Sequence, residues 1–380
     1  MVWWIGLCIA FTLFYFFQFV YATINWARIE LFKPSSNSLH QNNFSIIVAV
    51  RNEEENIQQL LQNLNSLQFP KSQFEIILVD DQSTDQTLPL ARKFGADIEN
   101  LKVLSFDELE HSTIQGNKKR AIQLGVEAAK HEWVLTTDAD CELNSNHLNS
   151  LDGFIQNYDS IFISGPVVYS THNWFQHLQG IEFLGLVILG GAYLQAKNPV
   201  LCNGANLAFK RDVFRELNGY KGNLHQASGD DIWFMHKVFA EYPHKMHFAK
   251  CNDLIVKTKP SSTLSEFVNQ RKRWTAKNAT YQRKTYTATL AMDYLFYLSI
   301  ISAFVMALFI PNIWWLVALQ ASVKFVAELM LYASAQSFFR TKNWMLHYCF
   351  AFPFQIIYVV AIYPLSQFSK FNWKNRRFNA

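Results

Sequence analysis

The chain has 380 residues, half of them hydrophobic, yet its mean hydropathy is close to zero. Apolar and polar segments must therefore lie in different parts of the sequence. The net charge of +4 is too small to indicate a nucleic-acid-binding protein. The five cysteines are widely spaced and odd in number, which indicates neither a disulfide framework nor a zinc site. A reducing cytosol therefore suits the central part of the chain.

The first segment is apolar. Residues Val2 to Ile24 carry no charge and are rich in Phe, Trp and Ile, and about 20 such residues are enough for a helix to cross hydrocarbon. A secretory signal peptide is the competing interpretation, but the segment lacks a basic front end and a small-residue cleavage site. We therefore predict a transmembrane helix over residues 1–25, followed by a polar linker over 26–43.

From residue 44 onward, short apolar runs alternate with helical patterns. The predicted strands are Phe44–Val50, Phe74–Asp81, Leu101–Phe106, Trp133–Thr137 and Ile161–Ser164, and the predicted helices are Glu53–Leu67, Thr84–Phe94 and Asn117–Lys130. This alternation predicts an α/β domain with a mostly parallel, Rossmann-like sheet, over residues 44–285. Ligands of such sheets bind beyond the carboxyl ends of the strands. The polar residues expected to converge there are Arg51, Asn52, Asp80, Asp81, Asp138 and Asp140.

The C-terminal region, residues 286–380, is again apolar. Three segments, Ala288–Ile310, Trp314–Phe339 and Trp344–Phe368, are long enough to be membrane helices. The apolar stretch Gln176–Gln195 contains a glutamate and four glycines, so we expect it to lie on a membrane surface or inside the domain rather than to span.

Two of the three C-terminal apolar segments contain residues that are unusual in a membrane helix: a pair of charges in one and two prolines in the other. Lys324 and Glu328 are one helical turn apart, and such charges are costly within a membrane unless they are paired. We expect them to pair with each other. Pro353 and Pro364 can break the last segment into a re-entrant or interfacial piece.

Basic residues near helix ends predict the orientation, because they gather on the cytoplasmic side. Arg28 and Lys33 follow the first segment and nothing charged precedes it, so we expect an integral membrane protein with its central domain in the cytoplasm, at the inner or plasma membrane. Arg340 and Lys342 agree with this. The final basic residues fall on the opposite side if all three C-terminal segments span, so either the last segment does not fully cross or the rule fails here; these residues are Lys374, Arg376 and Arg377.

Two aspartates, Asp138 and Asp140, follow the predicted strand that begins at Trp133. Aspartates often accept local backbone hydrogen bonds in turns, which is the plain alternative. At the carboxyl edge of a parallel sheet, however, they suit Mg²⁺ or Mn²⁺, which usually takes one or two carboxylates together with substrate phosphates.

The helix that opens with Lys118-Lys119-Arg120 places three cations against its own dipole, each at a cost of about 0.3–1 kcal/mol when exposed. An anionic ligand at this helix start would offset the repulsion, and a solvated basic face is the alternative. By contrast, the run Glu53–Glu55 suits the start of its predicted helix.

Two further motifs lie nearer the C-terminus. Asp230 and Asp231 precede a helical pattern, where one carboxylate can cap the helix while the other faces a ligand. A plain N-cap is the alternative. The run Gln270-Arg271-Lys272-Arg273-Trp274 offers guanidinium groups for phosphate and a ring for stacking, although contact with anionic lipid heads is the commoner role of such a stripe.

Taken together, these motifs resemble the family 2 inverting glycosyltransferases of the GT-A fold. The similarity extends over about residues 44 to 280 and is greatest to the membrane-bound branch with cellulose, hyaluronan and poly-N-acetylglucosamine synthases and ceramide glucosyltransferase. It rests on seven motifs in order: Asn52-Glu53, Val79-Asp80-Asp81-Gln82-Ser83, Lys118, Asp138-Ala139-Asp140, Asn203-Gly204-Ala205-Asn206, Gly229-Asp230-Asp231 and Gln270-Arg271-Lys272-Arg273-Trp274.

The resemblance implies a role for each matching residue. In the donor site, Lys118 lies beside the nucleotide, Asp138 approaches the ribose and the metal, and Asp140 is the direct metal ligand. Asp230 and Asp231 form the family's acidic pair, with Asp231 as catalytic base. The base and ribose pocket is lined by Asn52, Glu53, Asp80 and Asp81, and the motif that closes over the diphosphate and acceptor supplies Gln270, Arg273 and Trp274.

The implied activity is transfer of a sugar from a nucleotide-diphosphate donor, UDP-sugar in most of the branch, to a lipid or lipid-linked acceptor. The chain departs from the family in its Asp-Asp pair, where many relatives have Glu-Asp, and in its small membrane region. Two other classes remain as alternatives: a non-catalytic membrane assembly partner with a glycosyltransferase-like domain, and a membrane-tethered receiver-like module that uses the pair Asp80-Asp81.

Overall fold

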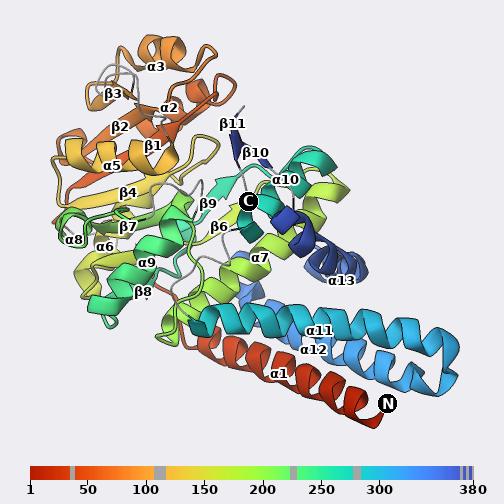
Figure 1. Ribbon diagram of the computed structural model, residues 1–380. Coiled ribbons are helices and arrows are strands. Elements are labelled where there is room, and N and C mark those ends of the chain that lie inside the picture. Colours follow the sequence, from red (N-terminus) through yellow and green to blue (C-terminus); the bar gives the residue numbers. More distant parts are fainter. Residues whose placement is uncertain are drawn as a thin grey trace. The chain divides into compact units, whose positions relative to one another are not determined.

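Figure 1 shows the computed structural model, which describes residues 1–34, 39–106, 117–222, 229–276, 284–368, 371–373 and 376–378. The chain divides into two compact units. The sheet unit comprises Glu30–Ser170 and Lys197–Lys259, and the helical unit comprises Met1–Ile29, Thr171–Ala196 and Pro260–Ala380. The domain predicted over 44–285 is continuous, whereas two segments within that range, 171–196 and 260–285, belong to the helical unit.

The sheet unit is built on seven strands. Across the sheet they lie in the order β3 (Leu101–Ser105), β2 (Phe74–Asp80), β1 (Phe44–Val50), β4 (Trp133–Thr137), β7 (Leu207–Lys210), β5 (Phe162–Ser164) and β8 (Met246–Phe248). All neighbours pair in parallel except β7, which is antiparallel to β4 and β5. Every residue of β2 and β4 is buried, as expected for strands covered on both faces. The predicted mostly parallel α/β sheet is confirmed.

Helices follow most of these strands. They are α2 (Ile57–Asn65), α3 (Thr87–Gly95), α5 (Lys118–Ala128), α6 (His147–Asn157), α8 (Arg211–Glu216) and α9 (Asp230–Glu241). One predicted helix start is wrong. The chain between Glu53 and Asn56 forms a turn in which the Glu53 carbonyl accepts from the N–H groups of Asn56 and Ile57, so the three glutamates precede α2 and do not occupy its first turn.

Three long helices of the helical unit run alongside one another (Figure 1). They are α1 (Val2–Ala27), α11 (Lys284–Phe309) and α12 (Trp314–Phe339). The expected pairing inside α12 is confirmed, because Lys324 Nζ lies 2.7 Å from Glu328 Oε2 and both side chains are almost completely buried. Tyr15 and Tyr348 also donate hydrogen bonds to the Glu328 carboxylate, so this buried carboxylate has an ion-pair partner and two hydrogen-bond donors within the unit.

The remaining helices of this unit are α7 (Trp174–Gln195), α10 (Leu264–Ala276) and α13 (Trp344–Phe368), followed by a hairpin of β10 (Phe371–Trp373) and β11 (Arg376–Phe378). Lys374 lies outside the described residues. α13 continues through Pro353 and Pro364, so the prolines do not break it.

Among the described residues, five helices are long and apolar enough to cross a membrane: α1, α7, α11, α12 and α13. The topology of the sheet argues against a single crossing by α7. It lies in the sequence between β5 and β7, which pair with each other in one sheet. A helix that crossed once between them would place the two strands on opposite sides of the bilayer. This agrees with the expectation of a helix that does not span.

Candidate active site

The carboxyl ends of three neighbouring parallel strands form the acidic edge of the sheet unit. In the strand register Val50 lies beside Asp80, and Val48 lies beside Thr137. The turns that follow these strands therefore begin at nearly the same level. This arrangement brings the motif after β4 and the motif after β2 to one edge of the sheet, as the sequence pattern predicts.

After β4 the chain turns at Asp138-Ala139-Asp140 and then pairs with β9 (Val256–Thr258) through a bridge between Glu142 and Lys257. Burial raises the pKa of Asp140 to about 6; the charges of Asp138 and Glu53 add to this effect, while a hydrogen bond from Thr258 opposes it. A buried carboxylate with a like charge nearby is stabilised by a cation at the same place.

A cation of the chain itself meets this motif. Nζ of Lys118, the first residue of α5, lies 2.5 Å from Oδ1 of Asp138. Burial lowers the pKa of Lys118, but Asp138 and, more weakly, Asp230 and Asp231 outweigh it, so the net pKa lies above the usual value for lysine. Lys118 is therefore close in space to the acidic motifs of both β4 and α9.

The start of α5 is not a solvated basic face, because Lys119 is 1% exposed. The Asn117 side chain caps the helix by accepting the N–H of Arg120 at 3.1 Å. Part of the anionic charge that we expected a ligand to supply at this helix start comes from the Asp138 carboxylate.

The acidic pair begins α9, and its second member holds a neighbouring loop. Oδ2 of Asp231 accepts the N–H of Gly204 at 3.1 Å, and Oδ1 accepts its neighbour's N–H, that of Ile232, at 2.8 Å. The N-cap residue is Gly229, with φ of 81°, so neither aspartate is the N-cap. The Asn203–Asn206 motif thus lies against Asp231, and the carboxylate is oriented by backbone donors.

Tyr220 is a site residue that the sequence motifs did not reveal. It is 2% exposed. Burial raises its pKa well above the usual value for tyrosine, and the nearby charges of Asp230 and Asp231, together with Cys202, add to the effect. The phenol therefore remains protonated beside the acidic pair. No local pattern around Tyr220 distinguishes it from other buried aromatic residues.

The predicted nucleotide pocket is formed by the two turns that follow β1 and β2, which are hydrogen-bonded to each other. Asn52, in the left-handed conformation with φ of 50°, accepts the N–H of Thr84 at 2.9 Å. Arg51 Nη1 donates to the carbonyl oxygens that follow β2, at 2.6 Å for Asp81. Oδ2 of Asp80 accepts the N–H of Ser83 at 3.2 Å. These contacts fix the loops after β1 and β2 with buried aspartates between them.

The remaining predicted site residues, Gln270, Arg273 and Trp274, lie on α10 in the helical unit. Their role in the donor site remains a prediction. The start of α10 has reciprocal capping between Thr263 and Glu266, because Thr263 Oγ1 accepts the N–H of Glu266, whose own carboxylate accepts backbone N–H groups.

Arg271 anchors α10. Its side chain is 3% exposed and forms a forked ion pair with Glu182 of α7, with Nη2 at 2.5 Å from Oε2 and Nε at 3.1 Å from the same oxygen. Tyr358 of α13 donates a hydrogen bond to the same carboxylate. The guanidinium also stacks on Trp274, 4.4 Å from the ring centre. Arg271 is therefore buried and paired, and does not face lipid head groups.

The acidic edge suits a divalent cation that substrate also helps to bind. The described residues contain no group of three or more His, Cys, Asp or Glu arranged to hold a metal. Asp138 and Asp140 supply two carboxylates, which is the usual protein contribution to a Mg²⁺ or Mn²⁺ site that is completed by phosphates and water. The raised pKa of Asp140 is consistent with this use.

Sequence comparison supports the same family. The family described as “Glycosyl transferase family 2” matches residues 45–218, and “Glycosyl transferase family group 2” matches residues 133–366, more than half of the chain. The glycosyltransferase AglE of Haloferax volcanii is 31% identical over 52% of this chain and 62% of its own length.

Two other relatives match over shorter regions. The poly(ribitol-phosphate) β-N-acetylglucosaminyltransferase TarS of Staphylococcus aureus is 38% identical over 31% of this chain, and β-monoglucosyldiacylglycerol synthase of a Nostoc species is 33% identical over 27%. The matched regions span about a fifth of the length of each of these two relatives.

Among solved structures, the mannosyltransferase PcManGT of Pyrobaculum calidifontis, in complex with GDP-mannose and Mn²⁺, has a similar fold. The TM-score is 0.60 at 17% sequence identity, and the match covers 95% of this chain and 99% of that one. At this identity the likeness is one of fold.

Proposed function

This chain belongs to glycosyl transferase family 2, and from that premise we propose that it transfers a sugar from a UDP-sugar to a lipid or lipid-linked saccharide, with inversion at the anomeric carbon. One observation carries the proposal: Lys118 lies within the electrostatic reach of both Asp138 and the acidic pair of α9, so the elements needed for donor binding and for proton removal share one region.

Asp231 is the proposed general base. The acceptor oxygen attacks the anomeric carbon as the bond from that carbon to the diphosphate breaks, and the hydroxyl proton passes to the Asp231 carboxylate. Hydrogen bonds from the N–H groups of Gly204 and Ile232 hold that carboxylate in place. A single displacement inverts the sugar and needs no covalent enzyme intermediate. A positioned base contributes on the order of a hundredfold or more.

The leaving diphosphate gains negative charge during the displacement. Lys118 is held at the acidic edge by Asp138, where it can pair with phosphate oxygens. Asp138 and Asp140 would hold Mg²⁺ or Mn²⁺, which supplies neutralisation of the developing charge. The Mn²⁺ in the complex of PcManGT, a protein of similar fold, supports divalent metal use. In this proposal Arg273 adds a further cation, and Trp274 closes over the acceptor.

The nature of the acceptor is proposed from the helical unit and the relatives. A catalytic domain attached to apolar helices meets acceptors that are held at a membrane. The relatives include a synthase named for a glycosylated diacylglycerol, which is a glycolipid, and a transferase named for poly(ribitol-phosphate). Arg28 and Lys33 after α1 support a cytoplasmic catalytic unit.

The test is a donor screen with purified full-length protein in detergent. Nucleotide sugars with UDP, GDP and dTDP are incubated with a membrane lipid extract and Mn²⁺, and release of the nucleotide diphosphate is measured. We expect release with UDP-sugars and radioactivity from a labelled sugar in the lipid fraction. Absence of both release and labelling with every donor would favour the non-catalytic assembly partner, and labelling of water-soluble acceptors alone would exclude a lipid acceptor.

A further inference from the structure

α13 exposes an apolar face, whereas three of its buried residues, His347, Tyr348 and Ser366, carry polar groups. His347 and Tyr348 on the inner side are nearly inaccessible. The exposed residues follow one another at the spacing of one helix face, with exposed fractions between 48% and 64%: Leu346, Phe350, Phe354, Ile357 and Leu365. An apolar stripe of this length that no described residue covers is suited to lipid.

The antiparallel neighbours α11 and α12 form a hairpin, and their contacts give the position of α13 along the hairpin axis. Pairs of side chains in contact along this hairpin are Phe304 with Trp314, Ser299 with Gln320, and Tyr297 with Lys324. Continued toward the open end of the hairpin, this register places Tyr294 of α11 level with about residue 326 of α12, given a rise of about 1.5 Å per residue in both helices.

Both ends of α13 contact the hairpin at nearly the same position along the hairpin axis, which would be the membrane normal. Its Tyr348 contacts Glu328 and Tyr332 of α12, and its Tyr363 packs against Tyr294 of α11 in a tilted arrangement, with 4.8 Å between ring centres. These contacts differ in depth by less than about 10 Å, although the two tyrosines are about 22 Å apart along α13. A helix that crossed the bilayer beside α11 and α12 would change depth by nearly its own length.

The position of the chain after α13 gives a second, independent indication. β10 contacts α10. α10 precedes α11 in the sequence, so it lies before the membrane crossing that α11 would make. If α13 crossed the bilayer, β10 would emerge on the other side, away from α10.

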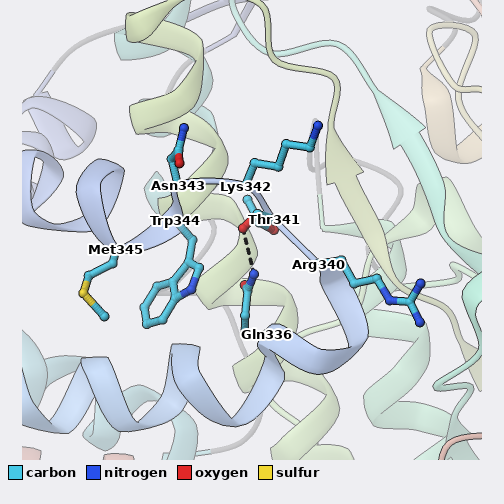
Figure 2. Close-up of a pocket in the computed structure, with 7 residues that line it drawn as sticks. All are labelled: Gln336, Arg340, Thr341, Lys342, Asn343, Trp344 and Met345. Atoms are coloured by element: carbon cyan, nitrogen blue, oxygen red, sulfur yellow. Dashed lines mark hydrogen bonds between the residues drawn. The ribbon is translucent and has the colours of Figure 1, made fainter.

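The start of α13 has the features of a lipid–water boundary. A pocket of ≈ 530 Å³ is lined by Gln336, Arg340, Thr341, Lys342, Asn343, Trp344 and Met345. Figure 2 shows Lys342 extending in one direction, while Trp344 and Met345 extend in the other. The two cations of this pocket form no ion pair with any described residue, and no acid lines it. Cations and Trp at this position match anionic head groups.

We infer that α13 does not span the membrane but lies in the plane of its cytoplasmic face, with its apolar stripe in the lipid and its first residues among anionic head groups. Of the five long apolar helices among the described residues, α1, α11 and α12 then cross. The hairpin of β10 and β11 then lies on the same side of the membrane as α10. β11, which carries Arg376 and Arg377, then lies on the same side of the membrane as Arg340, in agreement with the orientation that the basic residues predict.

Labelling of single cysteines from each side of the membrane tests the topology. The background is Cys202→Ser with Cys349→Ser, because the other three native thiols are buried. In it, Asp97→Cys reports on the sheet unit, Asn312→Cys on the turn between α11 and α12, and Ala380→Cys on the C-terminus. Inside-out and right-side-out vesicles are treated with a membrane-impermeant maleimide.

We expect Ala380→Cys and Asp97→Cys to be labelled from the same side and Asn312→Cys from the opposite side. Labelling of Ala380→Cys together with Asn312→Cys would overturn the inference. Depth is measured separately with nitroxides at Leu346, Ile357 and Leu365. A flat helix gives similar depths at all three, whereas a crossing helix gives depths that spread over about 28 Å.

Discussion

Nζ of Lys118 and Oδ1 of Asp138 lie 2.5 Å apart and join the start of α5 to the turn after β4. The two residues are 20 positions apart in sequence. Their pairing places a cation at the acidic edge of the sheet, where Lys118 also lies within the electrostatic reach of the acidic pair of α9.

Lys118→Met removes that cation. We expect the affinity for the nucleotide-sugar donor to fall by about tenfold, equivalent to about 1.4 kcal/mol, a modest loss because Asp138 is one-third exposed and solvent screens the pair. Donor binding by calorimetry provides the measurement. Lys102→Met on β3 is the matched control and should bind normally. An unchanged affinity in Lys118→Met would remove Lys118 from the donor site.

Asp231→Asn keeps an oxygen that can accept the N–H of Gly204 but cannot take up a proton. We expect turnover to fall by about a hundredfold or more while donor affinity changes little. Single-turnover transfer and donor binding, measured on the same preparation, separate the two effects. Asp212→Asn, an exposed aspartate beside Arg211, is the control. Normal turnover in Asp231→Asn would show that another group is the base.

Asp140→Ala should abolish stimulation by Mn²⁺, because Asp140 is the proposed direct ligand. Removal of a residue that only hydrogen-bonds to a metal ligand lowers metal affinity roughly 10- to 100-fold. We expect a larger loss of Mn²⁺-dependent donor binding in Asp140→Ala, because the ligand itself is removed. Binding of Mn²⁺ in the presence of UDP can be followed by electron paramagnetic resonance. Asp97→Ala, on an exposed loop, serves as control. Retained Mn²⁺ binding in Asp140→Ala would place the metal elsewhere.

Arg271→Lys keeps the charge but loses the forked geometry with Glu182. α10 would then hold Gln270, Arg273 and Trp274 less firmly. We expect kcat for transfer to fall by about tenfold, with a smaller change in the KM for the donor, since orientation is impaired more than initial binding. Steady-state kinetics, together with thermal unfolding, distinguish impaired orientation of the α10 residues from general destabilisation of the protein. Glu241→Gln on the exposed end of α9 is the control. If the fall in kcat is accompanied by a clear fall in the melting temperature, the role of Arg271 is purely structural.

His147, the first residue of α6, makes stability depend on pH. Burial lowers its pKa from 6.5 to about 3, against a weaker effect of the Asp253 backbone. Between these values the unfolded chain binds more protons than the folded one, so stability rises with pH from about 3 to 6.5 and is level above. The slope is about 1.4 kcal/mol per pH unit. His147→Gln should flatten the pH dependence of thermal unfolding, whereas exposed His244→Gln should not. An unchanged profile in His147→Gln would contradict this assignment.

The strands of the parallel sheet and the motifs at their ends were predictable because they depend on local patterns. Short apolar runs bounded by polar turns predict buried strands, and parallel strands necessarily bring their carboxyl ends to one edge. The start of α2 was not predictable in this way. The backbone of Glu53 is held in a turn by the Thr87 side chain of another helix, and this long-range contact overrides the favourable placement of three glutamates in a first helical turn.

The family, the alternation of strands and helices, and the residues that carry the proposed chemistry could be predicted from the amino-acid sequence, because motif order and apolar periodicity are local properties of the chain. The pairing of Lys118 with Asp138, the position of Tyr220 near the acidic pair and the pairing of Arg271 with Glu182 are visible only in the folded chain, because each joins residues that are distant in sequence. Length and composition are similar for a helix that crosses a membrane and for one that lies along it. The pairing of β5 with β7 argues against a crossing by α7, and the contacts of α13 carry the proposal that it lies in the membrane plane, because depth depends on position in space and not on hydropathy.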